Sequence, residues 1–97
     1  MVKWEYIELR NYRTSIQFTP ANKVDEQDIK NYFSKWTSAR FENNKYGHLD
    51  ITLPDTTVQP GFIAASDYLG RLGWEAFGTE QSDMGTFIFF KRELRDE

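Results

Sequence analysis

One histidine and one aspartate, two positions apart, are the residues of this 97-residue chain whose types and spacing could do chemistry. His48 and Asp50 fall in a segment that alternates polar and apolar residues, so both side chains would project to one face of a strand. An imidazole beside a carboxylate can share a proton or hold a metal ion. The chain has no second histidine and no cysteine, so a metal site would lack its further ligands. We expect a polar surface pair, with an enzyme that uses His48 and Asp50 as the alternative.

The serines and glycines do not form a catalytic or phosphate-binding motif. None of the serines lies in a G-x-S-x-G string, the setting of one common acyl-transfer nucleophile. Gly73 precedes a predicted strand rather than a helix, which is the wrong arrangement for binding phosphate at a helix N-terminus. The sequence therefore predicts no catalytic residue, no metal and no cofactor.

Charge is spread unevenly along the chain, whose formal net charge is −3. Residues 1–48 carry eight Lys/Arg and six Asp/Glu, whereas residues 49–97 carry four and nine. An acidic total argues against a dedicated nucleic-acid binder, because such affinity depends on neutralising phosphates. The chain also lacks cysteine, an apolar run of about 20 residues and an apolar leader, which predicts a protein of the reducing cytoplasm with no membrane partner.

Alternating apolar and polar residues predict five strands, at residues 2–10, 13–19, 46–53, 74–80 and 86–92. A first helix is predicted over residues 25–41, with Asp25 as its N-cap. Its apolar stripe would consist of Ile29, Tyr32, Phe33, Trp36 and Arg40. A second helix is predicted over residues 61–72, after a loop at 54–60, and Gly73 would supply its left-handed C-cap. Its core positions would be Phe62, Ala65, Leu69 and Leu72.

Three short strings open and close these elements: Trp4-Glu5-Tyr6, the junction from Leu69 to Glu75, and the strand end Phe89-Phe90-Lys91-Arg92. Together they resemble a family of very small bacterial and phage domains of unknown function, with a W-E-Y start, an L…G-W-E junction and an F-K-R end. The resemblance covers residues 3–9 and 61–92, and it implies a small fold of strands and helix but indicates no catalytic residues. Residues 11–60 would be an insertion relative to that family.

These elements predict a single α+β domain over residues 1–97, folded as a two-layer sandwich. Its mainly antiparallel sheet would have about five strands with both helices on one face, in the order β-β-α-β-α-β-β.

The aromatic content carries the functional prediction. The chain has eight Phe, five Tyr and three Trp, each able to bury on the order of 150–250 Å². Two short helices cannot cover all the rings that alternation places on the strands, among them Trp4, Tyr6, Trp74, Phe77, Phe87 and Phe90. A residual apolar face on a small domain usually binds a partner. We therefore expect a non-enzymatic interaction module that forms a homo-oligomer, or binds a host protein, through an aromatic sheet face or edge.

A second hypothesis is a binder that sequesters a small anionic metabolite or nucleotide, and that could be encoded by a phage. Arginines and stacking rings would hold such a ligand. The candidate surface for a ligand or partner comprises Trp4, Arg10, Arg13, His48, Asp50 and Trp74. Rings beside basic residues also suit single-stranded nucleic acid, but the acidic second half of the chain argues against that ligand.

Overall fold

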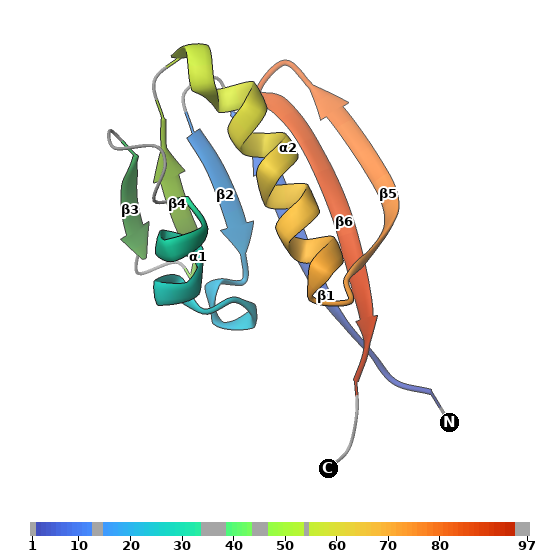
Figure 1. Ribbon diagram of the computed structural model, residues 1–97. Helices are drawn as coiled ribbons and strands as arrows, with labels where there is room; N and C mark the ends of the chain where they lie inside the picture. Colours follow the sequence, from blue (N-terminus) through green and yellow to red (C-terminus); the bar gives the residue numbers. More distant parts are fainter. Residues whose placement is uncertain (1, 13–14, 34–38, 44–46, 54, 95–97) are drawn as a thin grey trace.

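The alternating segments form one sheet in the computed structural model, which describes residues 2–12, 15–33, 39–43, 47–53 and 55–94. The strands are β1 (Trp4–Asn11), β2 (Ser15–Thr19), β3 (Arg40–Asn43), β4 (Leu49–Thr52), β5 (Glu75–Ser82) and β6 (Gly85–Glu93). Their order is β3-β4-β2-β1-β6-β5, and every neighbouring pair is antiparallel. Helices α1 (Glu26–Tyr32) and α2 (Asp55–Arg71) lie on one side of the sheet (Figure 1), and the 3₁₀ turn η1 (Ala21–Lys23) follows β2.

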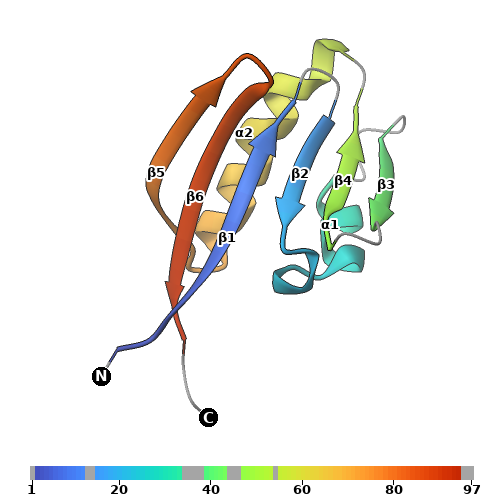
Figure 2. The same cartoon turned by 180° about the vertical axis from the view of Figure 1, so that it is seen from behind.

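The predicted α+β class and antiparallel sheet are confirmed, and the six strands observed are roughly consistent with the predicted number of about five. The predicted order of elements was wrong, because the observed order is ββαββαββ. The layering also differs from a complete two-layer sandwich, because α2 contacts β1 and β2 while seven of the eight residues of β5 are exposed. Seen from behind, the strands lie in front of both described helices (Figure 2). One face of the sheet is therefore partly covered by helices, and no described helix covers the other.

The first helix begins as predicted and ends early. The carboxylate of Asp25 accepts a hydrogen bond of 3.0 Å from the backbone N–H of Asp28, which satisfies one of the free donors of the first turn. The helix ends at Tyr32, and Phe33 is its C-cap, so the predicted continuation to residue 41 was wrong. Phe33 is nevertheless fully buried, as predicted for a core residue.

Strand pairing explains why the end of the predicted helix is not helical. Arg40 and Phe41, which the predicted helix over residues 25–41 included, belong to β3 and pair with Thr52 and Ile51 of β4. Pairing with β4 gives this segment ladder hydrogen bonds on one side, and Phe41 packs against the core beside Ile51. Tertiary pairing thus overrides a weak local helical preference. Trp36, the other predicted core residue of this segment, lies outside the described residues.

The second helix begins at Asp55, so the backbone of 56–60, predicted as a loop, is helical. Its end is a Schellman motif around Gly73, whose φ of +91° confirms the predicted left-handed cap. The N–H of Trp74 donates to the carbonyl of Leu69 at 3.0 Å, and the N–H of Gly73 donates to that of Gly70 at 3.1 Å. This motif commonly brings the residues in the positions of Trp74 and Leu69 into apolar contact. Both are buried here.

The core lies on the inner face, which we define as the sheet face toward α1 and α2. Buried side chains from the strands meet buried side chains from both helices there: Ile7, Leu9, Ile16, Phe18, Leu49, Ile51, Phe90, Ile29, Phe62, Ala65 and Leu69. The prediction that Leu69 is a core residue is confirmed. Leu72 is 39% exposed, so its assignment to the core was wrong. It follows the last residue of α2, where the chain already turns into the Schellman motif.

Two tyrosine–aspartate hydrogen bonds tie the helices together in reciprocal fashion. The hydroxyl of Tyr68 on α2 donates to Asp28 on α1 at 2.6 Å, and that of Tyr32 on α1 donates to Asp67 on α2 at 2.8 Å. The two rings also contact each other, with centroids 5.1 Å apart. Burial and the bond to Asp28 raise the pKa of Tyr68, and the bond to Asp67 and burial raise the pKa of Tyr32. Both phenols therefore stay protonated donors at neutral pH.

Candidate partner-binding surface

We define the outer face as the sheet face turned away from α1 and α2. The strand register identifies the residues that lie on it. Residues paired across neighbouring strands project to the same face, as do alternate residues of one strand. Ile7, Leu9 and Phe90 are buried on the inner face, so the residues that alternate with them point outward. The outward rows across β1, β6 and β5 are Trp4–Glu93, Tyr6–Lys91–Glu75, Glu8–Phe89–Gly78 and Arg10–Phe87–Glu80.

Four rings of this face form a cluster that we call the ring patch: Trp4, Tyr6, Phe77 and Phe89. The centroids of Tyr6 and Phe77 are 5.9 Å apart at an interplanar angle of 70°, and those of Phe77 and Phe89 are 6.3 Å apart at 40°. Lys91 Nζ lies 4.5 Å from the centroid of the Trp4 ring and 5.9 Å from that of Phe77. Trp4, Tyr6 and Phe77 are still 41%, 54% and 52% exposed. Contact among the rings does not hide them from solvent.

A β-bulge in β5 shapes the border of the ring patch. Ala76 pairs with Phe90 and Gly78 pairs with Phe89, so Phe77 is an extra residue between two rungs. An extra residue shifts all later alternation by one position. The shift places Glu80 on the outer face, where it pairs with Phe87, instead of on the inner face.

A shallow apolar groove of about 240 Å³ runs beside the rings. Tyr6, Phe77 and Phe89 line it, together with Thr19 and Pro20. Glu8 is the one carboxylate among the residues that line it. Ligand sites for drug-sized molecules usually measure about 300–1,000 Å³, so this groove is smaller than that range.

Carboxylates surround the ring patch. Glu8 accepts a hydrogen bond of 3.0 Å from Arg10. Within the described part of the chain, Glu75, Glu80 and Glu93 form no ion pair. The cation of the patch, Lys91, lies over the ring of Trp4 and makes no salt bridge with described residues. The surface is consequently aromatic at its centre, with the single cation Lys91 over the rings, and acidic at its border.

Around Arg10, toward β2, the outer face is polar, and its side chains hydrogen-bond to one another. The guanidinium of Arg10 donates to Glu8, to Gln17 at 3.2 Å and to the hydroxyl of Tyr12 at 3.3 Å, and it lies 5.5 Å from the centroid of the Phe87 ring. The hydrogen bond to Glu8 raises the pKa of Arg10 despite its partial burial. This arginine, predicted to bind a ligand or partner, is already engaged by four neighbours. Arg13, predicted beside it, lies outside the described residues.

His48 and Asp50 both lie beside outward residues of β2. His48 Nδ1 is 2.8 Å from Thr19 Oγ1, and the amide of Gln17 donates to Asp50 at 2.7 Å. Since Gln17 and Thr19 are alternate residues of one strand, the predicted common face of His48 and Asp50 is confirmed. Among the residues that the structure describes, no group of three or more His, Cys, Asp or Glu is placed to hold a metal ion. The enzymatic alternative for this pair stays a prediction.

The two tryptophans of the predicted surface differ in burial. Trp4 is exposed on the ring patch, whereas Trp74 is 4% exposed, so its assignment to the surface was wrong. The Schellman motif turns Trp74 into the core, and the guanidinium of Arg92 lies 4.3 Å from its ring centroid. Phe90, expected to add to the surplus of rings, is also buried at 4%.

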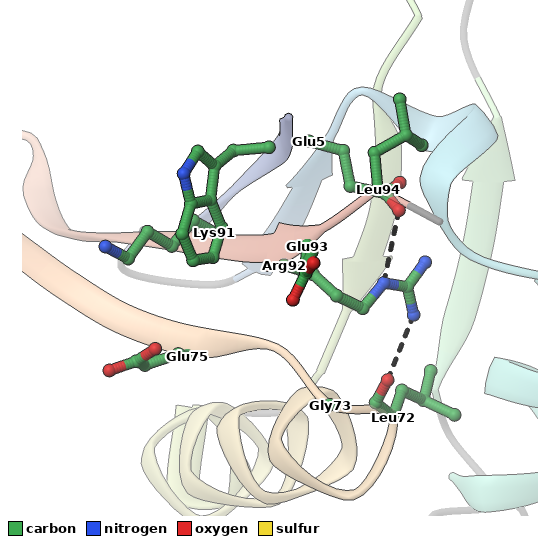
Figure 3. Close-up of a pocket in the computed structure, with 9 residues that line it drawn as sticks. Glu5, Leu72, Gly73, Glu75, Lys91, Arg92, Glu93 and Leu94 are labelled. Atoms are coloured by element: carbon green, nitrogen blue, oxygen red, sulfur yellow. Dashed lines mark hydrogen bonds and ion pairs between the residues drawn. The ribbon is translucent and has the colours of Figure 1, made fainter. Parts of the chain in front are cut away.

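A second hollow, of about 620 Å³, lies where the end of β6 meets the turn after α2 (Figure 3). Arg92 crosses it, with Nε 3.3 Å from Glu5 and Nη1 donating to the carbonyl of Leu72 at 3.0 Å. Burial raises the pKa of Glu5, but hydrogen bonds from Arg92 and Lys23 outweigh it and hold that pKa below its usual value. Glu75, Glu93 and Glu5 all line the hollow, beside Arg92 and Lys91. Three carboxylates against two cations do not favour an anionic ligand.

The sequence pointed to the exposed rings and missed the acidic border around them. Tyr6 and Phe77 belong to the surplus of rings deduced from alternation. The outward position of Glu80 depends on the bulge at Phe77, and those of Glu75 and Glu93 depend on pairing with β6 and β1. The dipeptide Phe77-Gly78 was the one local signal, because glycine inside a strand often marks a bulge.

Comparison with known proteins identifies no relative of this chain: no family model, no curated protein and no solved structure matches it. In the described part of the chain, no helix is both long and apolar enough to span a membrane. The function is therefore argued from the outer face itself.

Proposed function

We propose that this chain is a non-enzymatic interaction module that binds a protein partner through the ring patch on its outer face. The observation that carries this proposal is the exposure of Trp4, Tyr6 and Phe77, which remain 41–54% exposed on one face of the sheet although the rings of Tyr6 and Phe77 are in contact. Small monomers rarely leave contiguous apolar surface in water unless it has a function. Tryptophan and tyrosine are also the residues that most often dominate binding energy at protein interfaces.

The face is a better partner surface than the edge. β5 is the exposed edge strand next to the ring patch, but it contains the bulge at Phe77 and carries Glu75 and Glu80. Bulges and charges on an edge strand are the usual means by which proteins prevent edge-to-edge pairing. Three of the four rings, Trp4, Tyr6 and Phe89, instead project from β1 and β6, which lie inside the strand order of the sheet.

Self-association through the ring patch stays a prediction, and the border charges argue against it. Two copies packed face to face would bring the unpaired carboxylates Glu75, Glu80 and Glu93 of one copy near those of the other. Like charges at an interface oppose association. A heterologous partner of complementary charge avoids this cost. Light scattering of the purified chain decides between the two, because self-association predicts a concentration-dependent dimer.

The anionic metabolite or nucleotide also stays a prediction, as do the cytoplasmic location and the kinship with small bacterial and phage domains. Neither hollow favours an anion, since the groove is apolar and the larger hollow is lined by three carboxylates. Arg10, the described arginine assigned to such a ligand, is engaged by Glu8 and Gln17.

Site-specific photo-crosslinking in the cells that express the protein tests the proposal. The photoreactive residue p-benzoylphenylalanine replaces Phe77 in one variant, which retains an aromatic ring in the patch. In the matched control it replaces Ile63, which is 62% exposed on α2. We expect a discrete adduct, with another protein or with a second copy, from position 77 alone. Identical products from both positions would overturn the proposal.

A further inference from the structure

We infer that two copies of this chain pair edge to edge through the first half of β1 and continue the sheet across a two-fold axis. The inference goes beyond the function proposed above, because it concerns the backbone edge of β1 rather than the face that carries the ring patch. Three features of residues 2–6 support it: backbone groups without a partner, exposed apolar side chains, and a sequence that is complementary to itself.

The first half of β1 has a neighbouring strand on one side. β6 pairs with all of β1, whereas β2 pairs with it from Glu8 onward. Alternate residues of an antiparallel strand direct both backbone groups to the same neighbour. The carbonyl of Lys3 accepts a hydrogen bond of 2.8 Å from the N–H of Leu94, which extends the ladder with β6. Trp4 and Tyr6 therefore direct their N–H and C=O groups to the other side, where no described residue bonds to them.

The chain after β2 turns away from this stretch of β1 (Figure 2). The carbonyl of Ser15 accepts a hydrogen bond from the N–H of Tyr12, so Ser15 and, by alternation, Thr19 direct their backbone groups to β1. Ala21 is next in this alternation, but its N–H donates to the carbonyl of Gly47 at 2.7 Å, in the connection that leads into β4. The path of the chain thus leaves an edge of β1 that a strand of another molecule can extend.

Exposed apolar side chains accompany the free edge. Val2, Trp4 and Tyr6 alternate along the chain and are 56%, 41% and 54% exposed. A strand added at this edge would place its own outward side chains beside them. Association would then remove apolar surface from water and also satisfy the free backbone groups.

The sequence of the stretch is complementary to itself about Trp4. A two-fold axis at Trp4 sets each Glu5 opposite Lys3 of the other copy. It also sets each Tyr6 opposite Val2, and the two Trp4 side chains opposite each other. Aromatic pairs, pairs of an aromatic with a β-branched residue and pairs of opposite charge are the cross-strand contacts that stabilise a sheet. The occupant that fits this edge is therefore a second copy.

The other two-fold registers are unfavourable. An axis at Glu5 would set two carboxylates directly opposite each other, and an axis at Lys3 would do the same with two ammonium groups. Like charges in this position destabilise a sheet. An axis at Tyr6 would bring Trp4 opposite Glu8, which already pairs with β2. The axis at Trp4 avoids both conflicts.

The acidic border that opposes face-to-face packing lies away from this edge. Glu75 and Glu80 are on β5, which is separated from β1 by β6. Glu5 is flanked by Arg92 and Lys23, each at 3.3 Å, so its charge is already balanced on its own chain. Residues paired across strands project to the same face. The outer faces of both copies would thus lie on one side of the extended sheet, and both ring patches would stay open to a further partner.

Sedimentation equilibrium of the full chain tests the inference first. A reversible dimer should form between about 1 μM and 1 mM, the range expected for a small interface. A chain that is still a monomer at about 1 mM would overturn the inference.

Charge variants assign the dimer to the edge of β1. Lys3→Glu should raise the dissociation constant about ten-fold, because symmetry replaces two attractive pairs by two repulsive ones. Lys30→Glu, the same charge change on α1, should leave it unchanged, as should Phe77→Ser in the ring patch. Circular dichroism checks that each variant is folded. A dimer that Phe77→Ser dissociates and Lys3→Glu does not would be packed face to face, which would overturn the inference.

Disulfide trapping reports the register. The chain has no cysteine, so one introduced cysteine can form a disulfide with a second copy alone. The Cα atoms of a hydrogen-bonded antiparallel pair are about 5.5 Å apart, which a disulfide can span. Trp4→Cys should therefore give a covalent dimer on oxidation. Tyr6→Cys, whose own copy lies about four residues further along the strands, should not. Equal trapping at both positions would contradict the axis at Trp4.

Failure of this inference differs from failure of the proposed function. A monomeric chain that gives a specific adduct from position 77 would refute the inference alone. A dimer trapped by Trp4→Cys, in a chain that gives no specific adduct from position 77, would support the inference and refute the proposed function.

Discussion

The two faces of one sheet use large apolar residues in opposite ways. On β1, Ile7 is 2% exposed and its neighbour Tyr6 is 54% exposed; just before and within β5, Trp74 is 4% exposed and Phe77 is 52% exposed. The difference follows from where α2 lies, because it contacts β1 and β2 on the inner face. Aromatic content alone therefore does not separate core from binding surface. The side of the sheet on which each ring falls does.

This contrast assigns folding to one face and binding to the other. Substitutions on the inner face should lower the free energy of unfolding. Equivalent substitutions on the outer face should leave that free energy nearly unchanged and affect partner binding instead.

The largest effect is expected from a core phenylalanine. Phe18 is fully buried on β2, so Phe18→Ala should reduce the free energy of unfolding by about 3–5 kcal/mol through lost burial and a cavity. The same change at Phe77 should cost about 1 kcal/mol or less, because half of that ring is already in water. Urea denaturation of both variants measures the difference, and equal losses would erase the distinction between the faces.

Smaller changes in the free energy of unfolding are expected when alanine replaces glycine at two positions with different surroundings. Gly85 opens β6 with a φ of +153°, and an added Cβ would collide with the carbonyl of Asn11. Gly85→Ala should therefore destabilise the fold by roughly 1–3 kcal/mol. Gly70→Ala, on the exposed side of α2 with free space around it, should instead stabilise by up to about 1 kcal/mol. Thermal unfolding gives the sign of each change, and a stabilising Gly85→Ala would contradict the structure of this hairpin.

Two tyrosines give a subtler comparison between the faces. Tyr68 donates a 2.6 Å hydrogen bond to the Asp28 carboxylate, so Tyr68→Phe should cost about 1–2 kcal/mol. The hydroxyl of Tyr6 makes no hydrogen bond to the described chain, so Tyr6→Phe should be neutral within about 0.5 kcal/mol. The two urea midpoints measure this contrast. A Tyr6→Phe variant less stable than Tyr68→Phe would show that the outer face also holds the fold together.

The smallest expected effect is on how the stability of the fold depends on pH through Glu5. Burial raises the pKa of Glu5, but Arg92 and Lys23 lower it by more, so the pKa of the folded chain lies below that of the unfolded chain. Such a group stabilises the fold above its unfolded pKa of about 4.3, and the contribution is lost as pH falls through the folded value. Glu5→Gln should make the free energy of unfolding less dependent on pH in that window. Glu75→Gln, which removes an outward carboxylate without an ion pair, is the matched control; an equal effect from both would refute the role of Arg92 and Lys23.

The sequence predicted the elements whose signals are local. Gly73 marked the end of α2, and the same motif could have predicted burial of Trp74, because a Schellman cap usually packs that position against Leu69. The alternation in β1 placed Ile7 and Tyr6 on opposite faces. These features need only a few neighbouring residues.

Features that depend on distant pairing were not predictable in this way. Arg40 followed a helical spacing, yet it lies in β3 and pairs with Thr52 of β4. Glu80 faces outward because of a bulge that local alternation does not reveal. The rings of the candidate surface were therefore foreseen, and its acidic border was not.

Crosslinking from position 77 in two further backgrounds tests the central claim most directly. Tyr6→Ser removes a neighbouring ring of the patch, and Ile63→Ser removes a similarly exposed apolar side chain on α2. If the outer face binds the partner, the yield of the adduct falls sharply with Tyr6→Ser and is unchanged with Ile63→Ser, while both variants stay folded. Equal yields in the two backgrounds would show that the exposed rings do not form a partner surface.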